Sequence, residues 1–275
     1  MNIKQLIRAA LREDFGSRGD VTTRFFIPPQ TRLSGRIIAK EKGVICGTEI
    51  AGKVFHAASS ACRVKILVRD GRPVRPGQTV MKVSGGPALL SAERTALNFL
   101  QRMSGIATLT AAYARGLRGS RAKVYDTRKT LPGWRELDKY AVRRGGGINH
   151  RMGLYDAVLV KDNHWSCGRD IVESVKTVRR KYPGMKVEIE AAGFPQVRLA
   201  LEAGADIILL DNMPGGDLRR AIKIIRKAAP KTAIEISGGV SLKNIHALGR
   251  LGADRISVGR ITHSAPALDL SLEIP

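Results

Sequence analysis

The sequence has few aromatic residues and few cysteines, and it contains no long apolar run. Phe, Trp and Tyr make up 5% of the 275 residues, and the three cysteines are widely spaced with no Cys-x-x-Cys pair. Disulfide frameworks and zinc sites need paired or clustered cysteines, so this pattern argues against both. No window approaches the roughly 18 apolar residues that a membrane span requires, and we expect no membrane partner.

Acidic residues are scarce relative to basic ones. The chain has 24 Asp and Glu against 47 Lys and Arg, which gives a formal net charge of +23. Such a charge attracts anions, whether nucleic acid, acidic membrane or a polyanionic metabolite. Nucleic-acid-binding proteins usually interleave aromatics with basic residues or carry a recognition motif, and neither is visible here. A basic solvated surface explains most of the excess, so we expect no specific nucleic acid partner.

Residues 1–119 are predicted to form an N-terminal domain. Apolar spacing predicts helices at about 2–13, 48–58 and 91–117, the last with Arg94 on its polar stripe and a possible break at Gly105. Short apolar runs between 24 and 90, broken by Gly and Pro, are typical of strands, and Pro76-Gly77 favours a type II turn. No apolar signal-peptide core follows the first helix, so we expect a cytoplasmic protein.

Residues 120–275 alternate between strand and helix patterns, which predicts a second domain built on a parallel sheet. The predicted strands are 122–127, 156–161, 186–191, 206–211, 233–237 and 255–259, and the predicted helices are 135–144, 169–182, 195–204, 215–229 and 241–252. A complete eight-stranded barrel usually needs roughly 250 residues. The fold class expected is therefore α/β, with an incomplete, open α/β barrel.

Charged residues follow several of the predicted strands, at the edge where parallel α/β folds place their active sites. The cations are Arg128, Lys129, His150, Arg151 and Lys161, and the carboxylates are Glu190 and Asp211. Such a set suits a small, highly charged anion, with the carboxylates contacting sugar hydroxyls or a Mg²⁺ ion that carries phosphate. Lys161 ends an apolar strand, and a desolvated lysine needs a partner, so we expect an anion beside it.

Two loops rich in small residues follow the last predicted strands. "EISGGV" contains Ser237, Gly238 and Gly239, and "SVGRITHS" contains Gly259. Glycine lets backbone N–H groups approach an oxyanion closely, so both loops are candidate phosphate cradles. The triplet Gly145 to Gly147 is explained equally well as a third close-approach loop or as a helix C-cap.

Long segments of the chain resemble the quinolinate phosphoribosyltransferase family. They include "LREDFGSRGDVTT", "SAERTALNFLQRMSGIAT", "DTRKTLPG", "KYAVRRGGGINHRMGLYDAVLVKDNH" and "ISGGV", and the likeness covers essentially the full length. The nearest rival is a molybdenum-linked family of the same fold, which resembles this chain less around "KYAVRRGGGINHR" and "LVKDNH". The resemblance implies an open barrel at 120–275 beside an α/β sandwich at 1–119.

The resemblance also implies an activity: transfer of phosphoribose from phosphoribosyl pyrophosphate to quinolinate, with decarboxylation to nicotinate mononucleotide in NAD biosynthesis. It implies Mg²⁺ as cofactor and a homodimer with a shared site, and it leaves open further assembly into hexamers. Lys129, Lys161, Glu190 and Asp211 would be catalytic, the last two also contacting Mg²⁺. The substrate-binding residues would be Arg94 from the neighbouring subunit, Arg128, His150, Arg151, Ser237, Gly238, Gly239 and Gly259.

Overall fold

The computed structural model describes residues 2–167 and 170–275. The chain divides into two compact units. The first, here called the N-terminal unit, comprises the segment ending at Ala111 together with Thr130–Gly146 and Ile261–Pro275. The second, here called the barrel unit, comprises Ala112–Lys129 and Gly147–Arg260. Each unit therefore comprises more than one segment of the chain.

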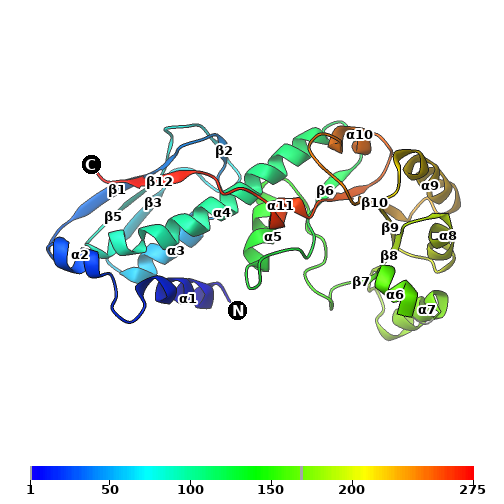
Figure 1. Ribbon diagram of the computed structural model, residues 1–275, viewed down its shortest axis with the longest axis horizontal. Helices are drawn as coiled ribbons and strands as arrows, with labels where there is room; N and C mark the ends of the chain where they lie inside the picture. Colours follow the sequence, from blue (N-terminus) through cyan, green and yellow to red (C-terminus); the bar gives the residue numbers. More distant parts are fainter. Residues whose placement is uncertain (1, 168–169) are drawn as a thin grey trace. The chain divides into compact units, whose positions relative to one another are not determined.

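The N-terminal unit is built on an antiparallel sheet of four strands in the order β12-β1-β5-β3 (Figure 1). Its strands are β1 (Leu33–Ala39), β3 (Arg63–Ile66), β5 (Thr79–Gly85) and β12 (Leu270–Glu273), and a separate pair is formed by β2 (Gly43–Val44) and β4 (Pro73–Val74). Its first helices are α1 (Ile3–Phe15), α2 (Val21–Phe26) and α3 (Thr48–Ala58). The turn before β5 is of type II as predicted, since Gly77 has φ +80° and Gln78 N–H donates to Arg75 O at 3.1 Å.

Helix α4 (Ala88–Gly116) runs for 29 residues without interruption, so the break considered at Gly105 does not occur. Gly105 has a packing role instead, because a Cβ atom there would lie 1.9 Å from the carbonyl oxygen of Pro266. The glycine lets the C-terminal segment lie directly against the helix. Among the described residues, no helix, α4 included, is both long and apolar enough to cross a membrane.

Helix α5 (Arg135–Arg144) belongs to the N-terminal unit, where its side chains form a hydrogen bond and an ion pair. Tyr140 donates its hydroxyl to Asp70 at 2.9 Å, and Arg102 of α4 forms a 2.8 Å ion pair with the fully buried Asp138. Gly145 caps the helix, and a Cβ atom on it would lie 2.4 Å from Ala107 O. The glycine triplet thus combines a C-cap with a close approach, here between two helices.

The barrel unit contains a parallel sheet of six strands in the order β6-β11-β10-β9-β8-β7, which leaves β6 and β7 at its edges. It is an open α/β barrel, as predicted. Its strands are β6 (Lys123–Tyr125), β7 (Val158–Val160), β8 (Val187–Ala191), β9 (Ile207–Asp211), β10 (Ala233–Ser237) and β11 (Arg255–Ser257). The helices are α6 (Asp162–Cys167), α7 (Ile171–Lys181), α8 (Phe194–Glu202), α9 (Gly215–Ala228) and α10 (Ile245–Gly249). Helix α11 (Arg260–His263) begins at the last residue of this unit and belongs otherwise to the N-terminal unit. The predicted helix start at residue 169 lies outside the described residues.

The two faces of the barrel sheet differ in chemistry, because side chains alternate along each strand. One face carries apolar residues, among them Val187, Ile189, Ile208, Leu210, Ile234, Ile236 and Ile256, all buried. Helix α8 packs on β8, and α9 packs on α8. The opposite face of β8 and β10 carries Glu188, Glu190 and Glu235, which are also buried. A charged inner face is unusual for a packed core, and it locates the candidate site.

Candidate active site

The register of the barrel sheet places the strand-borne candidates on one face. Glu190 of β8 pairs with Leu209 of β9, and Asp211 stands two residues further along β9, on the same side as Leu209. Asp211 in turn pairs with Ser237 of β10. The three side chains therefore share the charged inner face near the carboxyl ends of their strands. This is the edge at which α/β folds bind ligands.

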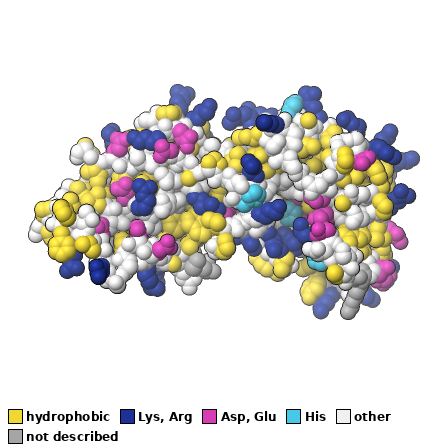
Figure 2. Space-filling model, viewed as in Figure 1, with side chains coloured by type: hydrophobic (Ala, Val, Ile, Leu, Met, Phe, Trp, Pro, Cys, Tyr) yellow, Lys and Arg dark blue, Asp and Glu magenta, His cyan; other side chains and the backbone are white. Residues whose placement is uncertain are grey.

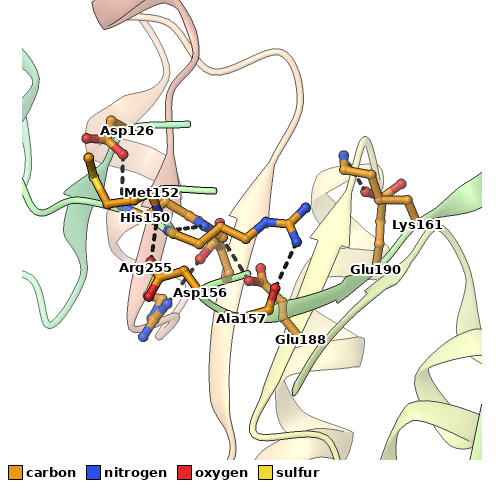
Figure 3. Close-up of polar contacts among 11 residues, drawn as sticks. Asp126, His150, Met152, Asp156, Ala157, Lys161, Glu188, Glu190 and Arg255 are labelled. Atoms are coloured by element: carbon orange, nitrogen blue, oxygen red, sulfur yellow. Dashed lines mark hydrogen bonds and ion pairs between the residues drawn. The ribbon is translucent and has the colours of Figure 1, made fainter. Parts of the chain in front are cut away.

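Lys161 follows β7 and lies beside Glu190, with 3.3 Å between Nζ and Oε2 (Figure 3). The predicted anion is thus present as a carboxylate of the protein. The argument that led to it was wrong, however, because the Lys161 side chain is 49% exposed and so is not desolvated. The strand ends one residue before Lys161, which leaves the ammonium group in reach of solvent and of a bound ligand.

His150 is held by three buried carboxylates. Its backbone N–H donates to Asp126 Oδ1 at 2.8 Å, and its Nε2 lies 2.9 Å from Glu188 Oε2 and 3.6 Å from Glu235 Oε1 (Figure 3). Burial lowers the pKa of the imidazole, but the hydrogen bond to Glu188 and the charges of Glu235 and Glu188 outweigh it, and the net pKa is raised. His150 is therefore part of a buried cluster of ionisable groups.

Glu188, Glu235 and Arg255 are site residues that the sequence reasoning missed. Glu188 is 1% and Glu235 0% exposed, and Arg255 NH1 lies 3.7 Å from Glu235 Oε2. Burial raises the pKa of Glu235 to about 7, assisted by the neighbouring Glu188, against the opposing effects of His150, Ser257 and Arg255. The signal was present, since "VEIEA" and "AIEIS" place charges at alternate positions of otherwise apolar strands.

The raised pKa of Glu235 predicts a pH-dependent stability. A carboxyl whose pKa rises on folding from 4.5 to about 7 stabilises the fold below pH 4.5, and this contribution is lost as the pH rises through about 7. Replacing Glu235 with Gln removes the titration. We expect the difference in the free energy of unfolding, variant minus wild type, to become more positive by roughly 1 to 3 kcal/mol between about pH 5 and about pH 8. One pKa unit corresponds to about 1.4 kcal/mol. Denaturant unfolding at both pH values measures this, and a constant difference would contradict it.

Arg128 and Arg151 form the cationic part of the site. Arg151 NH1 donates to Ala157 O at 2.8 Å. Burial lowers the pKa of the Arg151 guanidinium, and the positive charge of Arg128 lowers it further. Two guanidinium groups that repel each other favour an anion between them. Lys129 follows with an exposed side chain, and its backbone N–H donates to Thr127 Oγ1 at 3.0 Å.

The loop after β10 is shaped by positive φ angles, +88° at Gly238 and +60° at Gly239. A Cβ atom on Gly238 would lie 2.1 Å from Oδ1 of Asn212, itself at φ 51°. Asn212 N–H donates to Ser237 O at 3.0 Å, which joins the end of β9 to the start of this loop. Only glycine fits such a position, so the loop keeps its backbone open to a ligand. Gly259, half-buried, stands two residues after β11.

All the predicted site residues except Arg94 lie in the barrel unit. Arg94 lies on α4 in the N-terminal unit, where its side chain is exposed. In Figure 2, Lys and Arg side chains, like Asp and Glu side chains, are spread over both units. The fold of one unit therefore assembles most of the set, whereas Arg94 belongs to the other unit.

Among the residues that the structure describes, we compare two groups that have donor atoms suited to a metal ion. Glu190 and Asp211 offer carboxylates on one face of neighbouring strands, which suits a Mg²⁺ ion held by one or two carboxylates and by substrate phosphates. The second group is His150, Glu188 and Glu235, with candidate ligand atoms within 4.8 Å of one another. That cluster is already joined by the 2.9 Å contact of His150 with Glu188 and balanced by Arg255. Glu190 and Asp211 fit Mg²⁺ better.

Comparison with known proteins gives one consistent family. The family models described as "Quinolinate phosphoribosyl transferase", N-terminal domain and C-terminal domain, match residues 20–104 and 106–273. Nicotinate-nucleotide pyrophosphorylase [carboxylating] of Mycobacterium leprae is 40% identical over 274 residues, covering 98% of this chain and 96% of its own. A probable enzyme of that name from Bacillus subtilis is 38% identical over 276 residues, covering 100% and 94%.

Solved structures agree with the sequence comparison. The nicotinate-nucleotide pyrophosphorylase of Francisella tularensis superposes with a TM-score of 0.92 at 36% identity, covering 99% of this chain and 96% of its own. The Ehrlichia chaffeensis protein of that name gives a TM-score of 0.93 at 35% identity, covering 100% and 99%. Both domain models match in order along nearly the whole length. The chain belongs to the quinolinate phosphoribosyltransferase family.

Proposed function

We propose that this protein transfers the phosphoribosyl group of phosphoribosyl pyrophosphate to quinolinate and releases CO₂, giving nicotinate mononucleotide for NAD biosynthesis. The observation that carries the proposal is the charged inner face of the barrel sheet, where cations, two carboxylates and a glycine loop meet at the strand ends. The relatives named nicotinate-nucleotide pyrophosphorylase [carboxylating] support the same reaction. The reaction makes a pentosyltransferase of the protein.

Quinolinate is a pyridine with two adjacent carboxylates, and it needs fixed positive charge. Arg128 and Arg151 are close enough for the charge of one to lower the pKa of the other, so they suit the two carboxylates. His150 stands next to Arg151 in the chain and belongs to the same part of the site. Lys129 and Lys161 are both exposed, and they would lie between the two substrates.

The phosphoribosyl donor needs partners for its phosphates and ribose. Glu190 and Asp211 would hold its Mg²⁺ ion or ribose hydroxyls. Ser237, Gly238, Gly239 and Gly259 would surround the 5′-phosphate, where the open backbone of the glycine loop offers N–H donors. When bound, Mg²⁺ would neutralise charge on the leaving pyrophosphate.

The chemistry follows from these placements. The bond from ribose C1 to the pyrophosphate oxygen breaks with its electron pair, so positive charge develops on the sugar and negative charge on the leaving group, near Lys161 and Lys129. The pyridine nitrogen then bonds to C1. Once quaternised, this nitrogen stabilises the electron pair left at the ring carbon when the adjacent carboxylate departs as CO₂. A proton takes its place. The protein mainly positions and desolvates the reacting groups.

We further propose a cytoplasmic homodimer in which Arg94 reaches the site of the neighbouring subunit. Arg94 is exposed on a different unit from the rest of the set. Large apolar side chains are also exposed on the single chain, with Phe25 at 74%, Phe26 at 79%, Leu154 at 73% and Tyr155 at 77%. Apolar groups of this size are often covered by a partner. Assembly into hexamers is left to measurement.

A direct assay tests the proposed reaction. Purified protein mixed with quinolinate, phosphoribosyl pyrophosphate and Mg²⁺ should form nicotinate mononucleotide, pyrophosphate and CO₂ in equal amounts, and chelation of the metal should stop the reaction. Nicotinate in place of quinolinate is the control and should give no product. Turnover of nicotinate without turnover of quinolinate would refute the assignment, as would glycosyl transfer to quinolinate without release of CO₂.

A further inference from the structure

Both ring nitrogens of His150 are engaged by groups of the protein itself. Nδ1 lies 2.8 Å from the backbone nitrogen of Arg151, whose N–H points at it. Nε2 lies 2.9 Å from Glu188 Oε2. The side chain of His150 is only 9% exposed. The imidazole therefore joins a buried carboxylate to the peptide that carries Arg151.

These two contacts define the tautomer. A backbone amide always carries its hydrogen, so Nδ1 of His150 must accept with its lone pair. The proton of the ring then sits on Nε2 and is donated to Glu188. The carboxylates raise the pKa of His150, yet a second proton would have to enter at Nδ1, where it would meet the Arg151 N–H. In this arrangement the imidazole is neutral, and charging it requires that peptide to turn away.

The same contacts determine where Arg151 points. The backbone N–H of His150 is held by Asp126 Oδ1 at 2.8 Å, and that of Arg151 by His150 Nδ1. The guanidinium is held at its far end by Ala157 O at 2.8 Å. Both ends of Arg151 are thus fixed, and its backbone is held through His150, which contacts Glu188.

We infer that Glu188 is a positioning residue: it fixes His150 as the Nε2–H tautomer, and His150 in turn fixes the Arg151 backbone and so aims its guanidinium at a ligand carboxylate. The identity of that ligand as quinolinate rests on the proposed function. His150 acts here through Arg151, with its own nitrogens occupied in the ligand-free protein. Buried partners of this kind commonly set histidine tautomers.

Nuclear magnetic resonance of the ligand-free, full-length protein tests the tautomer. The protein is labelled with ¹⁵N-histidine, and His150 is identified by the signals lost in His150→Gln. We expect Nε2 to be protonated and Nδ1 to have the shift of an acceptor nitrogen at neutral pH. A proton on Nδ1, alone or in an imidazolium, overturns the inference.

Two variants of equal side-chain size test the consequence. Glu188→Gln keeps an oxygen that accepts from Nε2, whereas Glu188→Met removes it at similar volume. We expect Gln to retain the tautomer and Met to give a mixture. The KM for quinolinate should rise on the order of tenfold in the Met variant and much less in the Gln variant. The KM for phosphoribosyl pyrophosphate should stay within about twofold in both.

Controls separate this role from a structural one. Glu202→Met, an exposed position on α8, should change neither the tautomer nor either KM. Equal rises in both KM values, or a Met variant with an unchanged His150 tautomer, contradict the inference. If Glu188→Met does not fold, the spectrum of wild type and the Gln variant still decides. Failure of the wild-type assay would refute the proposed function alone, because the tautomer is read without substrate.

Discussion

Replacement of Lys161 with Ala should lower kcat/KM for nicotinate mononucleotide formation by about 10² to 10³ while leaving the unfolding temperature nearly unchanged. The ammonium group stands at the end of β7, half exposed, 3.3 Å from Glu190 Oε2. A partly exposed ion pair contributes about 0 to 1 kcal/mol to stability, so little is lost on folding. In the transition state, by contrast, the variant lacks the ammonium group that would stabilise the negative charge developing on the departing pyrophosphate.

The matched control is Lys186→Ala. Lys186 also forms a 3.3 Å ion pair, with Asp206, and its side chain is 68% exposed. It precedes β8 and so lies at the opposite end of that strand from Glu190. We expect this variant to keep its activity. Near-normal turnover in Lys161→Ala, measured with both substrates saturating and then limiting, would remove Lys161 from the site.

Much of the fold follows from local patterns. The expected helices at 48–58 and 135–144 match α3 and α5 at both ends, and the barrel strands match within two residues at each end. Helices α6 and α11 were not predicted, and α10 spans Ile245–Gly249 where 241–252 was predicted. Asn244 explains the late start, because its side chain accepts from Ser241 N–H and donates to Gly239 O, which holds the preceding residues in a loop.

Features that depend on distant residues could not be read from local patterns. Strand β12 pairs with β1, so that Glu273 stands opposite Arg36, and no local pattern reveals such a partner. The same holds for Gly105, whose sequence context resembles a helix break. The glycine is needed because the backbone of Pro266, a residue distant in the sequence, packs directly against it. At β12 and at Gly105, tertiary packing and not local propensity determines the structure.

The candidate site was predicted in part for the same reason. Lys161, Glu190 and Asp211 were predicted because they follow or end apolar strands, and parallel strands bring their carboxyl ends together at one edge of the sheet. Glu188 and Glu235 were not predicted, since residues in the middle of a buried strand are expected to be apolar. Alternation along β8 and β10 reveals them once a barrel interior that binds a polar ligand is considered.

Mixing two inactive variants, Arg94→Ala and Lys161→Ala, should restore activity if the site is shared between subunits. Random exchange makes half of the dimers mixed, and each mixed dimer contains one barrel with Lys161 that faces a partner with Arg94. Total activity should therefore recover to about one quarter of wild type. Each variant alone should have little activity, since Arg94 and Lys161 are both needed in one site.

The matched control for this experiment mixes Lys161→Ala with Arg128→Ala. Both residues belong to the same barrel unit, so no mixed dimer has a complete set, and no recovery is expected. Activity is measured after subunit exchange in mild denaturant and dilution into substrate. If Arg94 serves the barrel of its own chain, the first mixture will also stay inactive, since each chain then lacks one residue of its own site. Recovery in the first mixture and not in the second is the outcome that a shared site requires, because only an exposed residue on a separate unit can be supplied by the partner.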